Sequence, residues 1–395
     1  MTIQLSNRVQ QVKPSPTLAI TAKAAELRAQ GKNIIGLGAG EPDFDTPDHI
    51  KDGGIKAIQN GQTRYTPVDG TPDLKKAIIE KFKTDNGLDY EMNQVMVSCG
   101  GKQTFYNLAQ AILNDGDEVI IPAPYWVSYP DMTILAGGVP VIVEAGKDQN
   151  YKITPEQLEA AITDKTKLFV INSPSNPSGV AYTAAELKAL AEVLLKYPQV
   201  VIATDDMYEK IWWMDEPFSN ILMVCPELYD RTMVLNGVSK AYAMTGWRIG
   251  YIAGPAAIVG AMKKIQSQST SNPAAMSQAA AVTAMTGDQG CIDPMLKAFK
   301  ERHDFVYNKV NSIEGLSCIE SDGTFYTFVY AQEAIDSLEG INNDLDLAAY
   351  LLEDAEVAIV PGSAFGLEGY FRMSYATSMD NLVEALERIE KALNK

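Results

Sequence analysis

The segment 236–248 contains a lysine and an arginine placed as reactive groups are, rather than as ordinary surface residues. Lys240 follows a buried strand pattern directly and has small and apolar neighbours, and Arg248 comes shortly after it. A lysine is ordinarily a solvated surface residue, but these neighbours would partly desolvate its ammonium group. Desolvation lowers the pKa of a lysine and makes its amine a nucleophile for carbonyl compounds. Arg248 is suited to clamp a phosphate group.

Few histidines and widely spaced cysteines argue against other familiar kinds of catalytic site. The two histidines, His49 at an expected helix start and His303 in a charged run, are interpreted as solvated helix residues. A Ser-His-Asp triad needs a well-placed histidine and most zinc sites need several. We therefore predict no metal site and expect a lysine to move protons. The cysteines form no CxxC pair and are expected to be reduced, mostly buried thiols; they are Cys99, Cys225, Cys291 and Cys318.

Two glycine-containing segments can be compared with known phosphate-binding and nucleotide-binding patterns. The segment 36–41 resembles a dinucleotide fingerprint only superficially, because it ends in glutamate rather than glycine. Gly100, Gly101 and Lys102 instead follow a strand pattern and precede a helical pattern. Glycines let a ligand approach the backbone, and the free N–H groups of a helix start attract phosphate. A plain strand-to-helix turn is the alternative interpretation of this segment.

The middle of the chain alternates between apolar strand patterns and helical patterns. Runs of consecutive apolar residues are typical of strands that are buried on both faces, and a helical pattern with regularly spaced leucines covers 184–195. This alternation predicts an α/β domain with a largely parallel sheet. The predicted strands are 95–98, 118–122, 139–143, 168–172, 200–204, 233–235 and 249–253.

The last part of the chain has a different pattern, which predicts a smaller α+β domain. Its strand patterns lie at 324–330, 358–360 and 370–375, with a helical pattern at 345–353 and a closing amphipathic helix. We predict a large domain at 48–290 and a smaller one formed by 1–47 together with 291–395. Ligands of open α/β sheets bind at the carboxyl ends of the strands, so the loops after the predicted strands are the expected site.

Composition and charge exclude several classes of partner. The chain of 395 residues is 46% hydrophobic and 21% charged, which is ordinary for a globular protein with a large core. Its formal net charge of -17 argues against nucleic acid and anionic membranes as partners. The polar start of the chain has no secretory signal pattern, and no stretch is apolar enough to span a membrane. We therefore expect a cytoplasmic protein.

Several motifs, in order along the chain, give it a specific resemblance. They are GEPDF at 40–44, YWVSYP at 125–130, NSPSNPSG at 172–179, TDDMY at 204–208, SKAYAMTGWR at 239–248 and FRMSYA at 371–376. With these motifs the sequence resembles the class I aminotransferases, and among them the bacterial-type aspartate aminotransferases of subgroup Ib. The resemblance implies fold type I, with a large domain whose mostly parallel seven-stranded sheet is flanked by helices, plus a smaller α+β domain.

The resemblance implies pyridoxal phosphate as the cofactor and assigns roles to the loop residues. Lys240 should bond to the cofactor aldehyde and later act as the base that moves the substrate's Cα proton. Asp205 should pair with the pyridine nitrogen and keep it protonated, so that the ring withdraws electrons. Tyr208 and Asn176 should donate hydrogen bonds to the phenolic oxygen of the cofactor, and Trp126 should stack on its ring.

The remaining implied contacts concern the phosphate and the substrate. Arg248 should hold the phosphate together with the backbone of Gly100, Gly101 and Lys102, and Ser239 is a further implied cofactor contact. Tyr65 should reach the phosphate of the neighbouring subunit in a homodimer; an ordinary loop tyrosine is the alternative. Arg372 should bind the substrate α-carboxylate through a bidentate fork. The other implied substrate contacts are Gly40, Trp126 and Asn176 at the amino-acid end and Lys13 and Lys102 at the distal carboxylate.

The implied reaction is the conversion of L-aspartate and 2-oxoglutarate into oxaloacetate and L-glutamate by a ping-pong exchange. Because two lysines are point charges and less exacting than an arginine fork, other specificities stay open, including aromatic amino acids, alanine, prephenate and a C–S lyase activity. A DNA-binding regulator with this fold would need a basic face, which the net charge disfavours.

Overall fold

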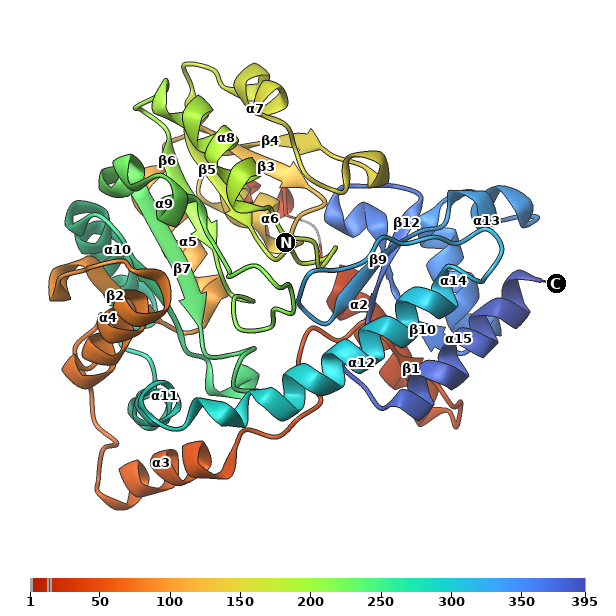
Figure 1. The fold of residues 1–395 in the computed structure, drawn as a ribbon, viewed down its shortest axis with the longest axis horizontal. Helices are drawn as coiled ribbons and strands as arrows, with labels where there is room; N and C mark the ends of the chain where they lie inside the picture. Colours follow the sequence, from red (N-terminus) through yellow and green to blue (C-terminus); the bar gives the residue numbers. More distant parts are fainter. Residues whose placement is uncertain (1–2, 13, 15, 395) are drawn as a thin grey trace.

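A seven-stranded sheet forms the centre of the computed structural model, which describes residues 3–12, 14 and 16–394 (Figure 1). In spatial order its strands are β2 (Val95–Ser98), β8 (Gly250–Ala253), β7 (Thr232–Gly237), β6 (Val201–Asp205), β5 (Thr166–Asn172), β3 (Glu118–Ala123) and β4 (Val139–Glu144). β8 runs antiparallel to both of its neighbours, and the other neighbouring pairs are parallel. The predicted α/β fold class with a mostly parallel sheet is confirmed, with strand ends shifted by a few residues.

The apolar runs form strands here because both faces of the sheet are covered. Along β5, Leu168 and Val170 pack into one hydrophobic cluster, whereas Phe169 and Ile171 pack into another. Successive side chains of a strand point to opposite faces, so a run of consecutive apolar residues supplies both clusters at once. This is why these strands do not show an alternation of apolar and polar residues.

Helices cover the two faces of the sheet. The face with Phe169 and Ile171 is covered by α3 (Asp48–Gln59), α4 (Pro72–Asn86), α7 (Pro155–Ala161), α8 (Ala184–Leu195), α9 (Ile221–Val224) and α11 (Ala275–Thr286). The opposite face is covered by α5 (Gly101–Ile112), α6 (Ser128–Leu135) and α10 (Ala256–Ser269). The predicted helix 184–195 coincides with α8. It begins there because the side chain of Thr183 accepts a hydrogen bond from the N–H of Glu186, forming a capping box.

The C-terminal part has its own small sheets and core. A three-stranded antiparallel sheet contains β11 (Val360–Pro361), β12 (Tyr370–Ser374) and β9 (Tyr326–Tyr330), and β1 (Ile35–Gly36) pairs in parallel with β10 (Val357–Ala358). The helices of this part are α2 (Pro16–Ala29), α12 (Asp293–Val310), α13 (Gln332–Ser337), α14 (Asp344–Asp354) and α15 (Met379–Leu393). The β1–β10 pairing joins the N-terminal segment to this part, while the domain boundaries at 48 and 290 stay a prediction.

Short helices complete the described chain. They are α1 (Asn7–Gln10), η1 (Met92–Gln94), η2 (Lys147–Gln149), η3 (Pro226–Arg231), η4 (Thr245–Trp247), η5 (Gln289–Cys291) and η6 (Gly362–Phe365). Across the described ranges, none of the helices combines the length and the apolar character that a membrane span requires. All four cysteines lie in these ranges as free thiols, with Cys225 and Cys318 buried and the other two partly buried.

The prediction that His303 is a solvated helix residue was wrong. Its side chain on α12 is buried, its Nε2 accepts a hydrogen bond from the N–H of Ser321 at 3.1 Å, and its Nδ1 lies 2.9 Å from the Asp304 carboxylate. Burial lowers the pKa of His303. The residue shares the buried stripe of α12 with Phe299 and Val306, so helical spacing, rather than its charged sequence neighbours, decides its environment. His49 is also partly buried, against expectation.

The buried stripe of α15 provides a test of this packing. Leu386 is fully buried in the C-terminal core, so Leu386→Ala should lower the free energy of unfolding by about 2–5 kcal/mol. Leu345, on α14, is 56% exposed, and Leu345→Ala should change it by no more than about 0.5 kcal/mol. Urea unfolding followed by circular dichroism at one protein concentration measures both. Equal losses in the two variants would contradict the packing of α15.

Candidate active site

A cavity of about 430 Å³ lies at the carboxyl ends of the central parallel strands. Asp205 is the last residue of β6, and Lys240 follows β7 by a few residues. Parallel strands bring their carboxyl ends to one edge of a sheet, which places these loops side by side. The residues predicted from the sequence that line this cavity are Gly40, Gly101, Lys102, Trp126, Asn176, Asp205, Tyr208, Ser239, Lys240, Arg248 and Arg372.

Two predicted site residues do not line the cavity, and a third is not among the described residues. Gly100 does not line the cavity, but it adjoins Arg248, which does line it. Tyr65 is 92% exposed on the surface of this chain and does not line the cavity. Lys13 lies outside the described residues.

The structure also places residues in the cavity wall that sequence reasoning missed. They include Gly38, Ala39, Glu41, Val127, Asn172, Met207, Thr245 and Tyr326. Tyr326 comes from β9 in the C-terminal part, far from the large sheet in sequence, and no local pattern distinguishes it. Glu41 and Thr245 lie inside two of the motifs, and the side chain of Thr245 donates a hydrogen bond to the Glu41 carboxylate at 2.8 Å.

The Lys240 amine has the environment of a reactive group. Its Nζ donates a hydrogen bond to the carbonyl oxygen of Gly40 at 2.5 Å. Burial lowers the pKa of Lys240 to about 8, and the positive charges of Arg372 and Arg248 act in the same direction, against the opposing charges of Glu41 and Asp205. The unprotonated form of this amine, which a nucleophile or general base requires, is therefore much more populated near neutral pH than in an ordinary lysine.

Asp205 is a buried carboxylate held by two neutral donors. Its Oδ2 accepts a hydrogen bond from the hydroxyl of Tyr129 at 2.5 Å, and its Oδ1 accepts one from the N–H of Met207 at 3.2 Å. The Asn172 side chain donates to its backbone carbonyl at 2.8 Å, which fixes the main chain. Desolvation raises the pKa of Asp205 to about 6, although these hydrogen bonds and the charge of Lys240 oppose the rise. A cationic ligand would find a preformed partner here.

Arg372 supplies a buried guanidinium whose N–H donors are not all used. The side chain is 3% exposed, and its two terminal nitrogens donate to the Asn176 side chain at 2.9 Å and to the carbonyl of Gly38 at 2.8 Å. Its charge lies 4.3 Å from the centre of the Tyr326 ring. The Nε is buried and has no hydrogen-bond partner among the described residues. Since an unpaired buried donor is costly, the arrangement favours an anionic ligand.

The start of α5 and Arg248 form an anion cradle. Gly100 caps this helix without a side-chain hydrogen bond, so the first N–H groups stay available. Arg248, with φ of 56°, adopts the left-handed conformation that is uncommon for residues other than glycine. Its guanidinium donates to the carbonyl oxygens of Thr245 and Cys99 at 2.8 and 3.3 Å. Gly100 has φ of 85°, which favours glycine, and a Cβ there would collide with Arg248 Nη2 and displace this guanidinium.

Aromatic side chains complete the wall. The Tyr208 hydroxyl donates to the Tyr326 hydroxyl at 3.2 Å. Trp126 meets Tyr129 edge to face with ring centres 5.2 Å apart, and the Lys102 ammonium lies 5.5 Å from the centre of the Trp126 ring. Burial lowers the pKa of Lys102, helped by the charge of Arg248. The cavity therefore combines an apolar ring surface with positive charge.

Comparison with known proteins assigns this constellation to a family. The family model "Aminotransferase class I and II" matches residues 32–389. The chain belongs to the class I and II aminotransferases. The resemblance drawn from the motifs is thereby confirmed, together with the enzyme class.

Individual aminotransferases are similar to this chain over its full length. An aspartate/prephenate aminotransferase of Nitrosomonas europaea is 60% identical over 397 residues, covering 99% of this chain and 100% of that protein. The solved aspartate aminotransferase of Rhizobium meliloti has a TM-score of 0.96 and 49% identity, covering 100% and 99% of the two chains. That of Thermus thermophilus with maleate has a TM-score of 0.93 and 41% identity, covering 99% and 100%. These similarities confirm fold type I.

The environment of Lys240 generates a prediction for the cofactor-free protein. The rate at which an amine-selective reagent modifies Lys240 should rise with pH through a midpoint near 8, because only the unprotonated amine reacts. In urea-unfolded protein the midpoint should move up to the ordinary lysine value of about 10.4. Peptide mass spectrometry of samples labelled across the pH range measures both. The same midpoint in folded and unfolded protein would refute desolvation of Lys240.

Proposed function

We propose that the protein is an aspartate aminotransferase, which converts L-aspartate and 2-oxoglutarate into oxaloacetate and L-glutamate in a ping-pong reaction. The observation that carries this proposal is the meeting of three groups in one cavity. They are the Lys240 amine, the buried Asp205 carboxylate and the buried Arg372 guanidinium. Each suits one part of an amino-transfer reaction: a nucleophile and base, an anion for a ring nitrogen, and a cation for a carboxylate.

The residues present fit pyridoxal phosphate as the cofactor. Its phosphate matches the start of α5 with Arg248, where a Cβ at Gly100 would occupy the space beside the guanidinium. Its ring nitrogen matches the carboxylate of Asp205, whose hydrogen-bond donors are both neutral. When bound, this group supplies an aldehyde that takes up the substrate's amine and a ring that withdraws electrons from the substrate's Cα.

The proposed roles of the cofactor-binding residues follow from these matches. Asp205 would hold the ring nitrogen protonated, and Trp126 would cover one face of the ring. Tyr208 and Asn176 would donate hydrogen bonds to the phenolic oxygen. The Tyr208 hydroxyl, which donates to Tyr326 in this structure, would then donate to the cofactor instead. The phosphate would be held by Arg248 and the backbone of Gly100, Gly101 and Lys102, and Ser239 would be a further cofactor contact.

Lys240 and Arg372 would handle the substrate itself. Arg372 would bind the α-carboxylate, aided by Asn176 and the backbone of Gly40, and this ligand would satisfy the Nε that has no other partner among the described residues. Lys240 would hold the cofactor and then remove the Cα proton. The lowered pKa of Lys240 keeps the amine able to accept that proton near neutral pH.

Lys102 and Lys13 are the proposed partners of the distal carboxylate. Lys102 lies in the cavity wall beside Trp126, while Lys13 rests on the motif resemblance alone. The Thermus thermophilus neighbour was solved with maleate, a dicarboxylate. The Nitrosomonas europaea relative is named for prephenate as well as aspartate. Prephenate carries two carboxylates, so it is a second candidate substrate for the same charges.

A homodimer is the proposed assembly. Tyr65 is 92% exposed and lies outside the cavity of its own chain. A large aromatic side chain so fully exposed is suited to an interface. In the proposed dimer the Tyr65 hydroxyl would reach the phosphate in the neighbouring subunit.

The first test is amino transfer by the purified protein supplied with pyridoxal phosphate. L-aspartate should shift the visible absorbance of the bound cofactor, and 2-oxoglutarate should restore it. Lys240→Ala should abolish turnover, because the base and the covalent anchor are both lost. Bound cofactor that aspartate leaves unchanged would refute the aspartate specificity. Alanine, aromatic and sulfur amino acids and prephenate would then be assayed. Normal turnover by Lys240→Ala would refute the assignment of Lys240.

The second test concerns the distal carboxylate. Lys102→Ala and Lys13→Ala should each lower kcat/KM for aspartate by about tenfold or more relative to alanine and phenylalanine, because a charge-assisted hydrogen bond is lost. Lys297→Ala removes a lysine whose side chain is 80% exposed and is the matched control. Steady-state kinetics with each amino donor measure the ratio. Equal losses for all three donors would remove that lysine from the distal pocket.

A further inference from the structure

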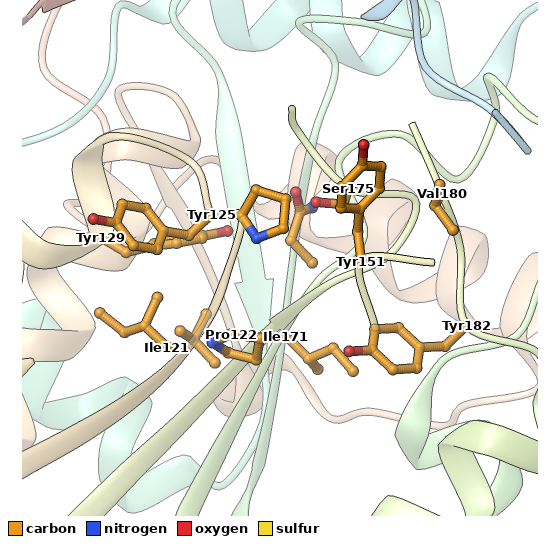
Figure 2. A pocket seen from close by; sticks show the side chains of 12 residues that line it. Ile121, Pro122, Tyr125, Tyr129, Tyr151, Ile171, Ser175, Val180 and Tyr182 are labelled. Atoms are coloured by element: carbon orange, nitrogen blue, oxygen red, sulfur yellow. The ribbon is translucent and has the colours of Figure 1, made fainter. Parts of the chain in front are cut away.

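Tyr129 lies just beneath the active-site cavity and takes no part in its wall. It stands in the first turn of α6, is fully buried, and donates its hydroxyl proton to Asp205 Oδ2 at 2.5 Å. Figure 2 shows Tyr129 beside a second, much smaller cavity, with Tyr182 on the opposite side. Tyr129 therefore contacts the active site through Oδ2 of Asp205.

The Tyr129 hydroxyl can act only as a donor toward this carboxylate. Burial raises the pKa of Tyr129 well above its usual range, and the nearby charge of Asp205 raises it further. The hydroxyl thus stays protonated at any working pH. The other hydrogen bond to the Asp205 side chain, from the N–H of Met207, is longer at 3.2 Å. Tyr129 is accordingly the main donor that offsets the cost of burying the Asp205 charge.

The same tyrosine also supports the aromatic wall. Its ring packs against Phe105 with centres 4.9 Å apart and against Trp126 edge to face at 5.2 Å. Because Tyr129 contacts both Asp205 and Trp126, one residue supports both the carboxylate and the ring of the cavity wall. The Tyr129 ring is thereby held with its hydroxyl on Asp205.

We propose that Tyr129 is a positioning residue that holds the Asp205 carboxylate charged and aimed at the ring nitrogen of pyridoxal phosphate. The inference rests on the proposed function, since it assigns Asp205 to that nitrogen. Tyr129 does not line the cavity, so its hydroxyl would act on the cofactor through Asp205.

Other ionisable groups around Asp205 do not replace this donor. Lys240 is the nearby cation, but its Nζ donates its hydrogen bond to the carbonyl oxygen of Gly40 rather than to Asp205. Tyr208 is fully buried, and its hydroxyl is bonded to Tyr326. The Asp206 carboxylate accepts hydrogen bonds from the side chains of Thr204 and Asn220 at 2.7 and 2.6 Å. Its negative charge would repel that of Asp205.

The test measures the dissociation constant of pyridoxal phosphate from the cofactor-free protein between pH 5 and 8.5, by equilibrium dialysis. Wild-type affinity should fall below about pH 6, because binding then requires Asp205 to lose a proton. Tyr129→Phe removes a hydrogen bond to the charged form, which raises the pKa of Asp205. Its fall-off should begin about one pH unit higher, so its affinity should be weaker by about twofold at pH 7, about fivefold at pH 6 and nearly tenfold at pH 5. The variants are therefore compared at pH 5.

Tyr182→Phe is the matched control, because it removes the hydroxyl of another buried tyrosine. That hydroxyl accepts a hydrogen bond from the N–H of Ile153 at 2.9 Å and has no contact with Asp205. This variant should keep the wild-type affinity and pH dependence. Thermal unfolding of the cofactor-free variants reports any general loss of stability separately.

A double-mutant cycle tests whether Tyr129 works through Asp205. In the Asp205→Asn background, Tyr129→Phe should change the dissociation constant by less than about twofold, because the charge it serves is gone. An undiminished effect in that background would overturn the proposal, as would a Tyr129→Phe variant with wild-type affinity and pH dependence. If wild-type protein bound no pyridoxal phosphate, the proposed function would fall together with this inference.

Discussion

The burial of Arg372 is the constraint on which the arrangement of the site depends. The guanidinium starts from β12 in the C-terminal part, bonds to Asn176 beyond β5 of the large sheet, and bonds to Gly38 in the N-terminal segment. Three distant stretches of chain are thus held by one charge. Taking that charge out of water is expensive unless its donors are satisfied, and desolvation lowers the pKa of Arg372. Cation–π contacts with the rings of Tyr326 and Phe365 offset part of the desolvation free energy of Arg372.

Buried charges in the cavity are balanced as a set rather than as separate ion pairs. Arg372 and Arg248 lower the pKa of Lys240, whereas Asp205 and Glu41 raise it. Asp205 is in turn stabilised by neutral donors. A site poised in this way suits an anionic ligand although the whole chain carries -17, because the local field of a cleft, and not the net charge, acts on a ligand.

The fold makes this balance of charges possible by bringing the ends of several strands to one edge of the sheet. Parallel strands deliver Asp205 and the Lys240 loop to the same edge, and the pairing of β1 with β10 brings Gly38 and Gly40 near the C-terminal part. Figure 1 shows α12 running from α11, beside the large sheet, to the C-terminal helices. The cavity therefore belongs to the junction between the two parts, and its residues come from almost the whole length of the chain.

The sequence by itself determined the elements and the reactive segment. Strand runs such as that of β5 and the helix at 184–195 follow from periodicity and capping, which act between residues a few positions apart. The motif around Lys240 and Arg248 is likewise local, so the amino-acid sequence alone is enough to recognise it.

Tertiary structure decided which side chains meet. Tyr129 and Asp205 are 76 positions apart, and Arg372 and Asn176 are 196 apart. No local pattern encodes such pairs. His303 shows the same limit, since its charged neighbours indicated solvent while the packing of α12 buried it. The physical reason is that burial, and with it each pKa in the cavity, depends on what the rest of the chain places around a residue.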